Sequence, residues 1–333
     1  MPHLTPPVNA AIVGYRMGAT HAELIHLVDD LQVTAICDTD PERRDAARDQ
    51  LGDITTYADV EEVAADAGIQ LVVVVTPHSA HLPCALRCLR AGKHVVVEKP
   101  MALSIAECTA MIEAAQEAGV TLSVFHNRRW DGVFTTARQV IRDGYIGDVF
   151  HVETHFGGYR PPSRTWRGDK EISGGLFYDW GAHMVDWTLG LLEGRRMVSV
   201  SGRFQKRVWH EASNEDHVEA FIRFDDGAVA HVQVSQIAAA GKPRFYVLGT
   251  EGALVDNWAG HVDVSARVGS HTATFNVDYD ESDWPAYYKG LADHLVNDAP
   301  NPVTPESARR VICVFELAER SSQDGGEQPV PHE

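Results

Sequence analysis

Short apolar runs alternate with longer amphipathic stretches over the first third of the chain. The runs are rich in β-branched residues and lack a polar–apolar alternation, which predicts strands buried on both faces of a parallel sheet. They lie at residues 10–13, 33–37, 71–75, 94–97 and 122–125. Helical patterns separate them at residues 41–52, 79–92 and 104–119. Strands that alternate with helices in this way predict a doubly wound α/β domain.

The pattern changes near residue 126. After a helical stretch at 133–142, polar and apolar residues alternate with period two, which predicts a largely antiparallel sheet with one face covered. These strands are expected at residues 149–155, 198–204, 217–224, 229–236, 244–249 and 261–268. Helical patterns return at 285–297 and 305–320, and the polar residues 321–333 are expected to be loose. The sequence thus predicts two domains, residues 1–125 and residues 126–333.

Composition and charge then narrow the class of protein. The 333 residues include 29 basic and 47 acidic side chains, which gives a formal net charge of −18. The acidic residues are spread along the chain and no run of Lys and Arg interrupts them. Neither nucleic acid nor an anionic membrane surface is therefore expected as a partner. Lysine is scarce, with six copies, so each lysine is a candidate for a specific role.

The cysteines and the apolar runs favour a reducing compartment. The five cysteines form no C-x-x-C pair, and their odd number does not suggest a disulfide framework. The apolar run at 71–75 is far shorter than the roughly 20 residues of a membrane helix. The N-terminal residues lack the pattern of a signal peptide. We expect a cytoplasmic protein with no membrane span and no metal site.

The connection after the first strand carries a shortened nucleotide-binding pattern. Gly14 follows the strand and Gly18 is expected to precede the helix, where a pyrophosphate could approach the helix N-terminus. The spacing is G-x-x-x-G, which a plain strand-to-helix turn would also explain. Asp38 ends the second strand, where a carboxylate binds the adenosine ribose and favours NAD over NADP. A helix cap or a turn aspartate is the alternative for Asp38, and Arg43 and Arg44 could instead receive a 2′-phosphate.

Three later segments carry a more specific signal. They are Thr76-Pro-His-Ser-Ala-His81, Ala91-Gly-Lys-His-Val-Val-Val-Glu-Lys-Pro100 and Ser173-Gly-Gly-Leu-Phe-Tyr-Asp179-Trp-Gly-Ala-His183. In order and spacing they resemble the Gfo/Idh/MocA oxidoreductases, which include glucose–fructose oxidoreductase and inositol dehydrogenases. The resemblance extends from Val8 to about Ser321, and the short glycine loop is its one departure from the family's pattern.

This resemblance implies a fold, a reaction and a set of catalytic residues. The fold would be a Rossmann domain followed by an α/β domain with a large, mostly antiparallel open sheet, assembled into dimers or tetramers. The reaction would be a reversible hydride transfer between NAD, or NADP, and a secondary carbinol of a sugar, inositol or related polyol. The residues that match the family's catalytic positions are Lys99, Asp179 and His183.

The residues themselves are consistent with these roles. Lys99 ends a strand at the carboxyl edge of the predicted sheet, where ligands bind in doubly wound folds. Asp179 and His183 lie four apart in an apolar, helix-like run, so the carboxylate can orient the imidazole and stabilise its charged form. An imidazole suits the general base that removes the alcohol proton. A solvated strand-end lysine and a surface i,i+4 pair are the structural alternatives.

Further candidates follow from position along the chain. Those expected to bind the cofactor are Gly14, Tyr15, Arg16, Met17, Gly18, Asp38, Thr76, Pro77, His81, Glu98, Lys99 and Asn127. Those expected to bind the substrate, beside the catalytic three, lie in a Pro-rich loop and are Tyr159, Arg164, Trp166 and Arg167. Aromatic rings and arginines suit a sugar. A turn role for Asn127 and a solvated loop are the alternatives.

Two other classes of function stay open. Asp179, His183 and Asp186 on one helix would suit a metal-dependent hydrolase, although no H-E-x-x-H or C-x-x-C pattern accompanies them. A non-catalytic protein that binds a nucleotide for regulation is the other class, and the intact catalytic positions argue against it.

Overall fold

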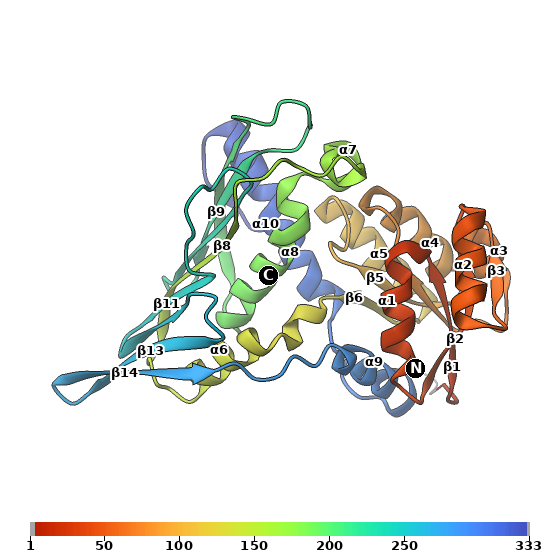
Figure 1. The fold of residues 1–333 in the computed structure, drawn as a ribbon, viewed down its shortest axis with the longest axis horizontal. Coiled ribbons are helices and arrows are strands. Elements are labelled where there is room, and N and C mark those ends of the chain that lie inside the picture. Colours follow the sequence, from red (N-terminus) through yellow and green to blue (C-terminus); the bar gives the residue numbers. More distant parts are fainter. Residues whose placement is uncertain (1–3, 332–333) are drawn as a thin grey trace. The chain divides into compact units, whose positions relative to one another are not determined.

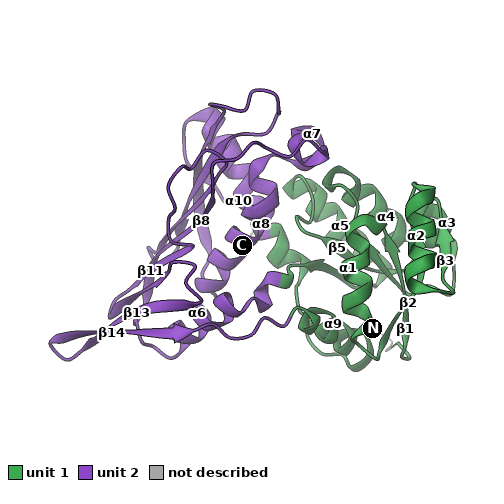
Figure 2. Cartoon of the chain, viewed as in Figure 1, with its two compact units in different colours: residues 1–127, 284–309 green, residues 128–283, 310–333 purple. Residues whose placement is uncertain are grey.

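The computed structural model describes residues 4–331, and the chain divides into two compact units (Figure 2). Unit 1 combines the chain up to Asn127 with Trp284–Arg309, and unit 2 combines Arg128–Asp283 with the chain from Arg310 onward. Each unit has its own sheet. Across the described residues, every helix is too short or too polar to cross a membrane.

A parallel sheet of six strands forms the centre of unit 1 (Figure 1). Its order is β3-β2-β1-β4-β5-β6, so the direction in which strands are added reverses between β1 and β4. The strands are β1 (Val8–Val13), β2 (Leu31–Cys37), β3 (Thr55–Tyr57), β4 (Leu71–Val74), β5 (His94–Glu98) and β6 (Leu122–Phe125). The predicted doubly wound sheet is confirmed. Ligands of such folds bind beyond the carboxyl ends of the strands, near the reversal.

Two groups of helices accompany this sheet. One group packs α1 beside α2 and α9, and the other packs α4 beside α3 and α5. The helices are α1 (Tyr15–His26), α2 (Pro41–Leu51), α3 (Val60–Ala65), α4 (His81–Arg90), α5 (Ile105–Ala118) and α9 (Pro285–Asn297). Right-handed crossovers on either side of the strand reversal place the two groups on opposite faces.

The start of α1 differs from the prediction. The helix begins at Tyr15, directly after Gly14, so Gly18 lies inside its first turns rather than before it. Gly14 has a φ of 96°, and a Cβ atom there would meet the Val75 carbonyl oxygen at 2.5 Å. A Cβ atom at Gly18 would meet Ile12 Cγ2 at 2.8 Å. The first glycine therefore makes the tight turn, and the second lets the helix pack closely on β1.

Helix α9 belongs to unit 1, although it lies far beyond residue 126 along the chain. Tyr287 and Tyr288 on this helix are fully buried. The Tyr287 hydroxyl donates to Ser123 Oγ on β6 at 2.9 Å, and Ser123 donates to the Val303 carbonyl at 3.0 Å. The spacing of the apolar residues in this helix shows that one of its faces is buried. It does not show on which sheet that face packs. The assignment of cofactor and substrate functions to two domains stays a prediction.

A mixed sheet of nine strands forms unit 2, in the order β14-β13-β12-β11-β7-β10-β9-β8-β15. Only β7 and β10 pair in parallel, so the prediction of a mostly antiparallel sheet is confirmed. Its strands are β7 (Val149–Gly157), β8 (Met197–Gln205), β9 (His217–Phe224), β10 (Val229–Ser235), β11 (Phe245–Gly249), β12 (Gly252–Asp256), β13 (His261–Val268), β14 (His271–Asp278) and β15 (Gln328–Pro329). The expectation of a loose end is wrong, because β15 pairs with β8.

Helices cover one face of this sheet (Figure 1). The long helix α8 (Leu176–Leu191) packs on β7 and β10, and Thr154 Oγ1 lies 3.0 Å from Thr188 Oγ1 between them. Helix α10 (Pro305–Asp324) lies against β8, where the Gly202 N–H donates to Ser321 Oγ at 3.1 Å. The remaining helices are α6 (Gly132–Arg142) and α7 (Lys170–Ser173). These contacts fix α8 on the sheet.

His94 at the start of β5 has a pKa lowered to about 4. Burial is the largest cause, because it disfavours the charged ring, and the nearby His294 adds to it. The Nδ1 atom of His94 accepts a hydrogen bond from the Thr121 N–H at 3.1 Å. An unfolded histidine has a pKa of about 6.5. As the pH falls from about 6.5 to about 4, the unfolded chain therefore binds this proton first, and stability is lost.

We expect His94→Asn to flatten the fall in unfolding free energy over this range of pH, because asparagine does not titrate and can still accept from Thr121. Urea unfolding of wild type and variant at a series of pH values measures the effect. The exposed His271 on β14, changed to Asn, is the control. A fall in unfolding free energy as steep in His94→Asn as in the wild type would contradict the expectation, since other histidines such as His155 keep the rest of the pH dependence.

Candidate active site

The turn between β1 and α1 is held by the end of β2. Asp38 is 6% exposed, and its Oδ2 accepts a hydrogen bond from the Tyr15 N–H at 2.8 Å. Its Oδ1 accepts from the Asp40 N–H at 2.9 Å. The predicted cofactor residues Arg16 and Met17 are exposed on the first turn of α1. The carboxylate thus fixes the helix N-terminus directly after the glycine turn.

Both arginines near this carboxylate are engaged with Asp38. Arg43 Nη1 lies 3.5 Å from Asp38 Oδ2, and Arg44 Nη1 donates to the Asp38 carbonyl at 2.6 Å. Asp38 does not cap α2, because the cap is Asp40, whose Oδ1 accepts from the Glu42 N–H at 3.0 Å. The bond from the Asp40 N–H to Asp38 Oδ1 is instead that of a turn aspartate. A 2′-phosphate would therefore meet the carboxylate of Asp38, and the two nearby arginines are already bound to Asp38.

The residues after β4 are tied to those after β5. His81 is fully buried, with Nε2 at 3.0 Å from the Thr76 carbonyl and Nδ1 at 2.9 Å from the Pro100 carbonyl. Burial lowers the pKa of His81, and the two carbonyls oppose it without reversing it. His81 thus joins two loops at the carboxyl edge of the sheet. That His81 and the neighbouring Pro77 contact a cofactor stays a prediction.

A buried chain of hydrogen bonds leads to Lys99. Tyr288 Oη on α9 lies 2.6 Å from Nδ1 of His21, and Nε2 of His21 lies 3.0 Å from Glu98 Oε1. The other oxygen of Glu98 accepts from the Lys99 N–H at 2.8 Å. A carboxylate only accepts, so Nε2 carries the proton, and in the neutral ring Nδ1 accepts from the tyrosine hydroxyl. Glu98 and Lys99 are thereby fixed at the end of β5.

The charge of Glu98 is favoured by these partners. Burial by itself would raise the pKa of Glu98, but the hydrogen bond from His21 and the charge of Lys99 outweigh it and lower the pKa. Sequence reasoning missed His21 and Tyr288, which come from α1 and from a helix far along the chain. The predicted Asn127 is half-buried just after β6. Unit 1 thus gathers the predicted residues at the carboxyl ends of its strands.

In unit 2, α8 presents Asp179 and His183. Asp179 lies in the first turn of this helix, and His183 lies one turn later on the same face and is 6% exposed. The alternative metal ligand Asp186 is bound by Arg129, whose Nη2 and Nε lie 2.6 and 2.9 Å from its two carboxylate oxygens. Within residues 4–331 no group of His, Cys, Asp and Glu is arranged to hold a metal ion. The hydrolase alternative therefore lacks its third ligand.

Aromatic side chains stack beside His183, and sequence reasoning missed them. The Trp180 ring lies 5.7 Å from that of His183 and stacks on Phe156 of β7 at 3.9 Å. The Arg128 guanidinium lies over Trp180 at 4.9 Å, and that of Arg160 lies over Phe156 at 5.7 Å. This stack packs α8 against β7 at the level of the histidine. A W-x-x-H spacing on one helix face is the only signal in the sequence.

The Pro-rich loop before α8 holds the predicted substrate residues. Tyr159 is 57% exposed and its ring lies edge-on to Trp209 at 5.8 Å. Arg164 is exposed, and the Arg167 guanidinium lies over the Trp166 ring at 4.5 Å. The loop therefore offers aromatic and cationic groups at the surface of unit 2. Their contact with a substrate stays a prediction.

Tyr288→Phe tests the hydrogen-bond chain in unit 1. The change leaves Nδ1 of buried His21 without its donor, so we expect a loss of about 1–3 kcal/mol in unfolding free energy. We also expect altered ¹⁵N shifts of the His21 ring. The neighbouring Tyr287→Phe is the control, because its hydroxyl binds Ser123 instead. It should destabilise the fold and leave the His21 shifts unchanged. Unchanged His21 shifts in Tyr288→Phe would contradict the chain.

Family models and known proteins match this chain over most of its length. Residues 8–126 match the family described as an oxidoreductase family with an NAD-binding Rossmann fold, and residues 134–255 match the GFO/IDH/MocA C-terminal domain. A scyllo-inositol 2-dehydrogenase (NADP(+)) of Bacillus subtilis is 28% identical, over 95% of this chain and 94% of the relative. A scyllo-inositol 2-dehydrogenase (NAD(+)) of the same organism is 32% identical, over 74% of this chain and 73% of that one.

One solved structure has the same fold over nearly the whole chain. The crystal structure of an NAD-binding protein from Listeria innocua has a TM-score of 0.87 and 28% identity, and it covers 97% of each chain. The family matches, the relatives and the fold agree with one another. The chain belongs to the Gfo/Idh/MocA oxidoreductase family and carries its NAD-binding Rossmann domain.

Proposed function

We propose that the protein is an NAD-dependent dehydrogenase or reductase that acts on a secondary carbinol of a sugar, an inositol or a related polyol. The observation that carries the proposal is the placement of Asp179 and His183 on one face of α8. Relatives named as inositol dehydrogenases support the class of substrate. Lys99, held by Glu98 in unit 1, is the third catalytic group of the proposal.

The residues of unit 1 fit a dinucleotide. Gly14 keeps the turn before α1 free of a side chain, and the helix N-terminus that follows favours a phosphate. Thr76 Oγ1 is buried and has no hydrogen-bond partner among residues 4–331, so it can bond a ligand. In the proposal, Asp38 at the end of β2 binds the adenosine ribose. When bound, the nicotinamide supplies the carbon that accepts or returns the hydride.

Each catalytic residue has a distinct role in this proposal. The His183 imidazole removes the proton from the substrate hydroxyl while the adjacent C–H bond is broken. The Asp179 carboxylate orients the imidazole and stabilises its charged form. The Lys99 ammonium stabilises the negative charge that develops on the reacting oxygen. In the reverse direction His183 returns the proton. In both directions the loop residues Arg164 and Arg167 bind hydroxyl groups of the substrate.

The proposal also covers the oligomeric state of the protein and its cellular compartment. The sheet face opposite the helices exposes Phe221, Val229 and Tyr246, which supports a homo-oligomer, a dimer or tetramer, formed through this face. All five cysteines in the described residues are free, which supports a reducing, cytoplasmic environment.

A screen of polyols, inositols and sugars with NAD, followed by absorbance at 340 nm, tests the reaction. On a substrate found in this way, we expect His183→Ala to lower kcat by about 10²–10⁴-fold, since that is the usual contribution of a general base. The dissociation constant for NAD should not change. A nearly unchanged kcat with a raised KM would make His183 a binding residue. Tight NAD binding with no turnover across the screen would favour the regulatory alternative.

Cofactor preference tests the role of Asp38. Its carboxylate repels a 2′-phosphate and binds Arg43, so we expect the wild type to prefer NAD. Asp38→Ser should lower the ratio of kcat/KM for NAD to that for NADP by at least about tenfold, or 1.4 kcal/mol. Asp40→Asn is the control, because Asp40 also contacts Arg43 but caps α2. A clear NADP preference in the wild type would overturn the assignment.

A further inference from the structure

Helix α8 begins without a capping side chain of its own. Its N-cap residue is Gly175, at a φ of 111°, and the N–H of Leu176 donates instead to Glu215 Oε2 at 3.1 Å. A Cβ atom at Gly175 would meet that same oxygen at 2.6 Å. The glycine leaves room for the carboxylate, and its positive φ is one that other residues rarely adopt. Glu215, which precedes β9, caps the helix that carries Asp179 and His183 from a distant part of the chain.

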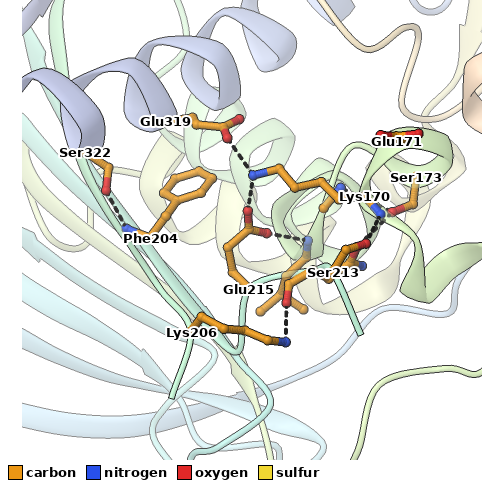
Figure 3. Close-up of polar contacts among 12 residues, drawn as sticks. Lys170, Glu171, Ser173, Phe204, Lys206, Ser213, Glu215, Glu319 and Ser322 are labelled. Atoms are coloured by element: carbon orange, nitrogen blue, oxygen red, sulfur yellow. Dashed lines mark hydrogen bonds and ion pairs between the residues drawn. The ribbon is translucent and has the colours of Figure 1, made fainter. Parts of the chain in front are cut away.

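A lysine holds the other oxygen of this carboxylate (Figure 3). Lys170 Nζ binds Glu215 Oε1 and also lies 2.5 Å from Glu319 Oε1 on α10. Glu215 is 7% exposed. Burial by itself would lower the pKa of Lys170, but the two carboxylates outweigh it and raise the pKa. The buried Glu215 carboxylate is thus paired with a cation and one backbone N–H, which is what makes a buried charge tolerable.

The residue before Glu215 fixes the loop that leads into α8. Asn214 accepts from Ser173 Oγ at 3.3 Å and donates through Nδ2 to the Arg167 carbonyl at 2.7 Å. Ser173 Oγ accepts in turn from the Gly175 N–H at 3.2 Å. Lys206 Nζ donates to the Asn214 carbonyl at 2.6 Å and so anchors this segment. Residues 214 and 215 therefore hold both the helix start and the loop before it.

We propose that Glu215, held by Lys170, is a positioning residue for the reaction. It fixes the first turn of α8 and with it the placement of Asp179 relative to His183. Asp179 lies in that first turn, whereas His183 lies one turn deeper in a helix packed on the sheet. Without the cap the first turn frays, and the carboxylate loses its register with the imidazole. The inference rests on the proposed function, because it assigns a role in that reaction.

Three variants separate this role from general stability. Glu215→Ala removes the cap and the ion pair, and Glu215→Gln keeps an oxygen that can accept from the Leu176 N–H. Glu319→Gln is the matched control, because it breaks the other ion pair of Lys170 and leaves both bonds of Glu215 in place. Should Glu215→Ala not fold, Lys170→Met weakens the hold on Glu215 and leaves its bond to Leu176 possible.

Hydrogen–deuterium exchange tests the cap without any need for activity. We expect the amides of residues 176–179 to exchange at least about tenfold faster in Glu215→Ala, to a smaller degree in Glu215→Gln, and unchanged in Glu319→Gln. With a substrate at hand, kcat of Glu215→Ala should fall by about 10–100-fold, since a misplaced group costs that much. The acidic limb of the pH–kcat profile should move to lower pH, because a displaced Asp179 stabilises the imidazolium less.

The outcomes are distinguishable. Unchanged exchange at 176–179 in Glu215→Ala overturns the positioning role, whatever the enzyme does. Faster exchange with kcat and the pH profile unchanged also overturns it, because the cap would then be structural alone. A wild type that turns over no polyol or sugar overturns the proposed function, while the exchange experiment still decides whether Glu215 fixes the start of α8.

Discussion

In both units a carboxylate that is largely removed from water holds the segment that carries the catalytic candidates. Glu98 accepts from His21 and from the Lys99 N–H, and Glu215 accepts from Lys170 and from the Leu176 N–H. A carboxylate removed from water is costly unless every oxygen is matched, so movement of either segment would leave a buried charge unpaired. The backbone at these two places is thus fixed by electrostatics rather than by packing alone.

Glycine occupies two positions where the backbone passes close to an oxygen atom. A Cβ atom would lie 2.6 Å from a side-chain oxygen at Gly175 and 2.5 Å from a backbone oxygen at Gly14. At Gly175 the missing Cβ leaves room for Glu215 Oε2, and at Gly14 it leaves room for the end of β4. The G-x-x-x-G spacing thus has a simple structural form. It is a turn in which α1 begins one residue after the strand, with Asp38 bonded to its first N–H.

The sequence allowed the main strands and helices to be predicted because their signals are local. Buried β-branched runs and the Ser104 cap, which accepts from the Glu107 N–H, depend on residues close in the chain. The strands that were missed are β3, β12, β14 and β15. Three of them give weak signals, because β3 has three residues, β15 has two, and β14 is exposed along most of its length. The predicted start of α1 was wrong because the sequence alone does not distinguish a glycine inside a helix from a glycine that precedes the helix.

The candidate site shows the same division between local and distant signals. Asp179 and His183 are four apart, so their shared face follows from helix geometry. His21 and Tyr288, and likewise Lys170 and Glu215, come from distant parts of the chain, and no periodicity pairs them. Long-range pairing of polar groups depends on the completed fold, and one sequence does not contain that information in a readable form.

The lysines of this chain are few, and several of them bind oxygen atoms of the protein itself. The net charge does not reveal this. Lys93 is 7% exposed and donates to the carbonyls of Asp66 and Ile69 at 2.5 and 2.9 Å. Lys206 anchors Asn214, and Lys170 holds Glu215. In an acidic chain whose cations are mostly arginine, these buried and half-buried lysines serve as compact charges with three donors each. The expectation that each lysine is a candidate for a specific role thus fits Lys93, Lys170 and Lys206, which bind carbonyl or carboxylate oxygens.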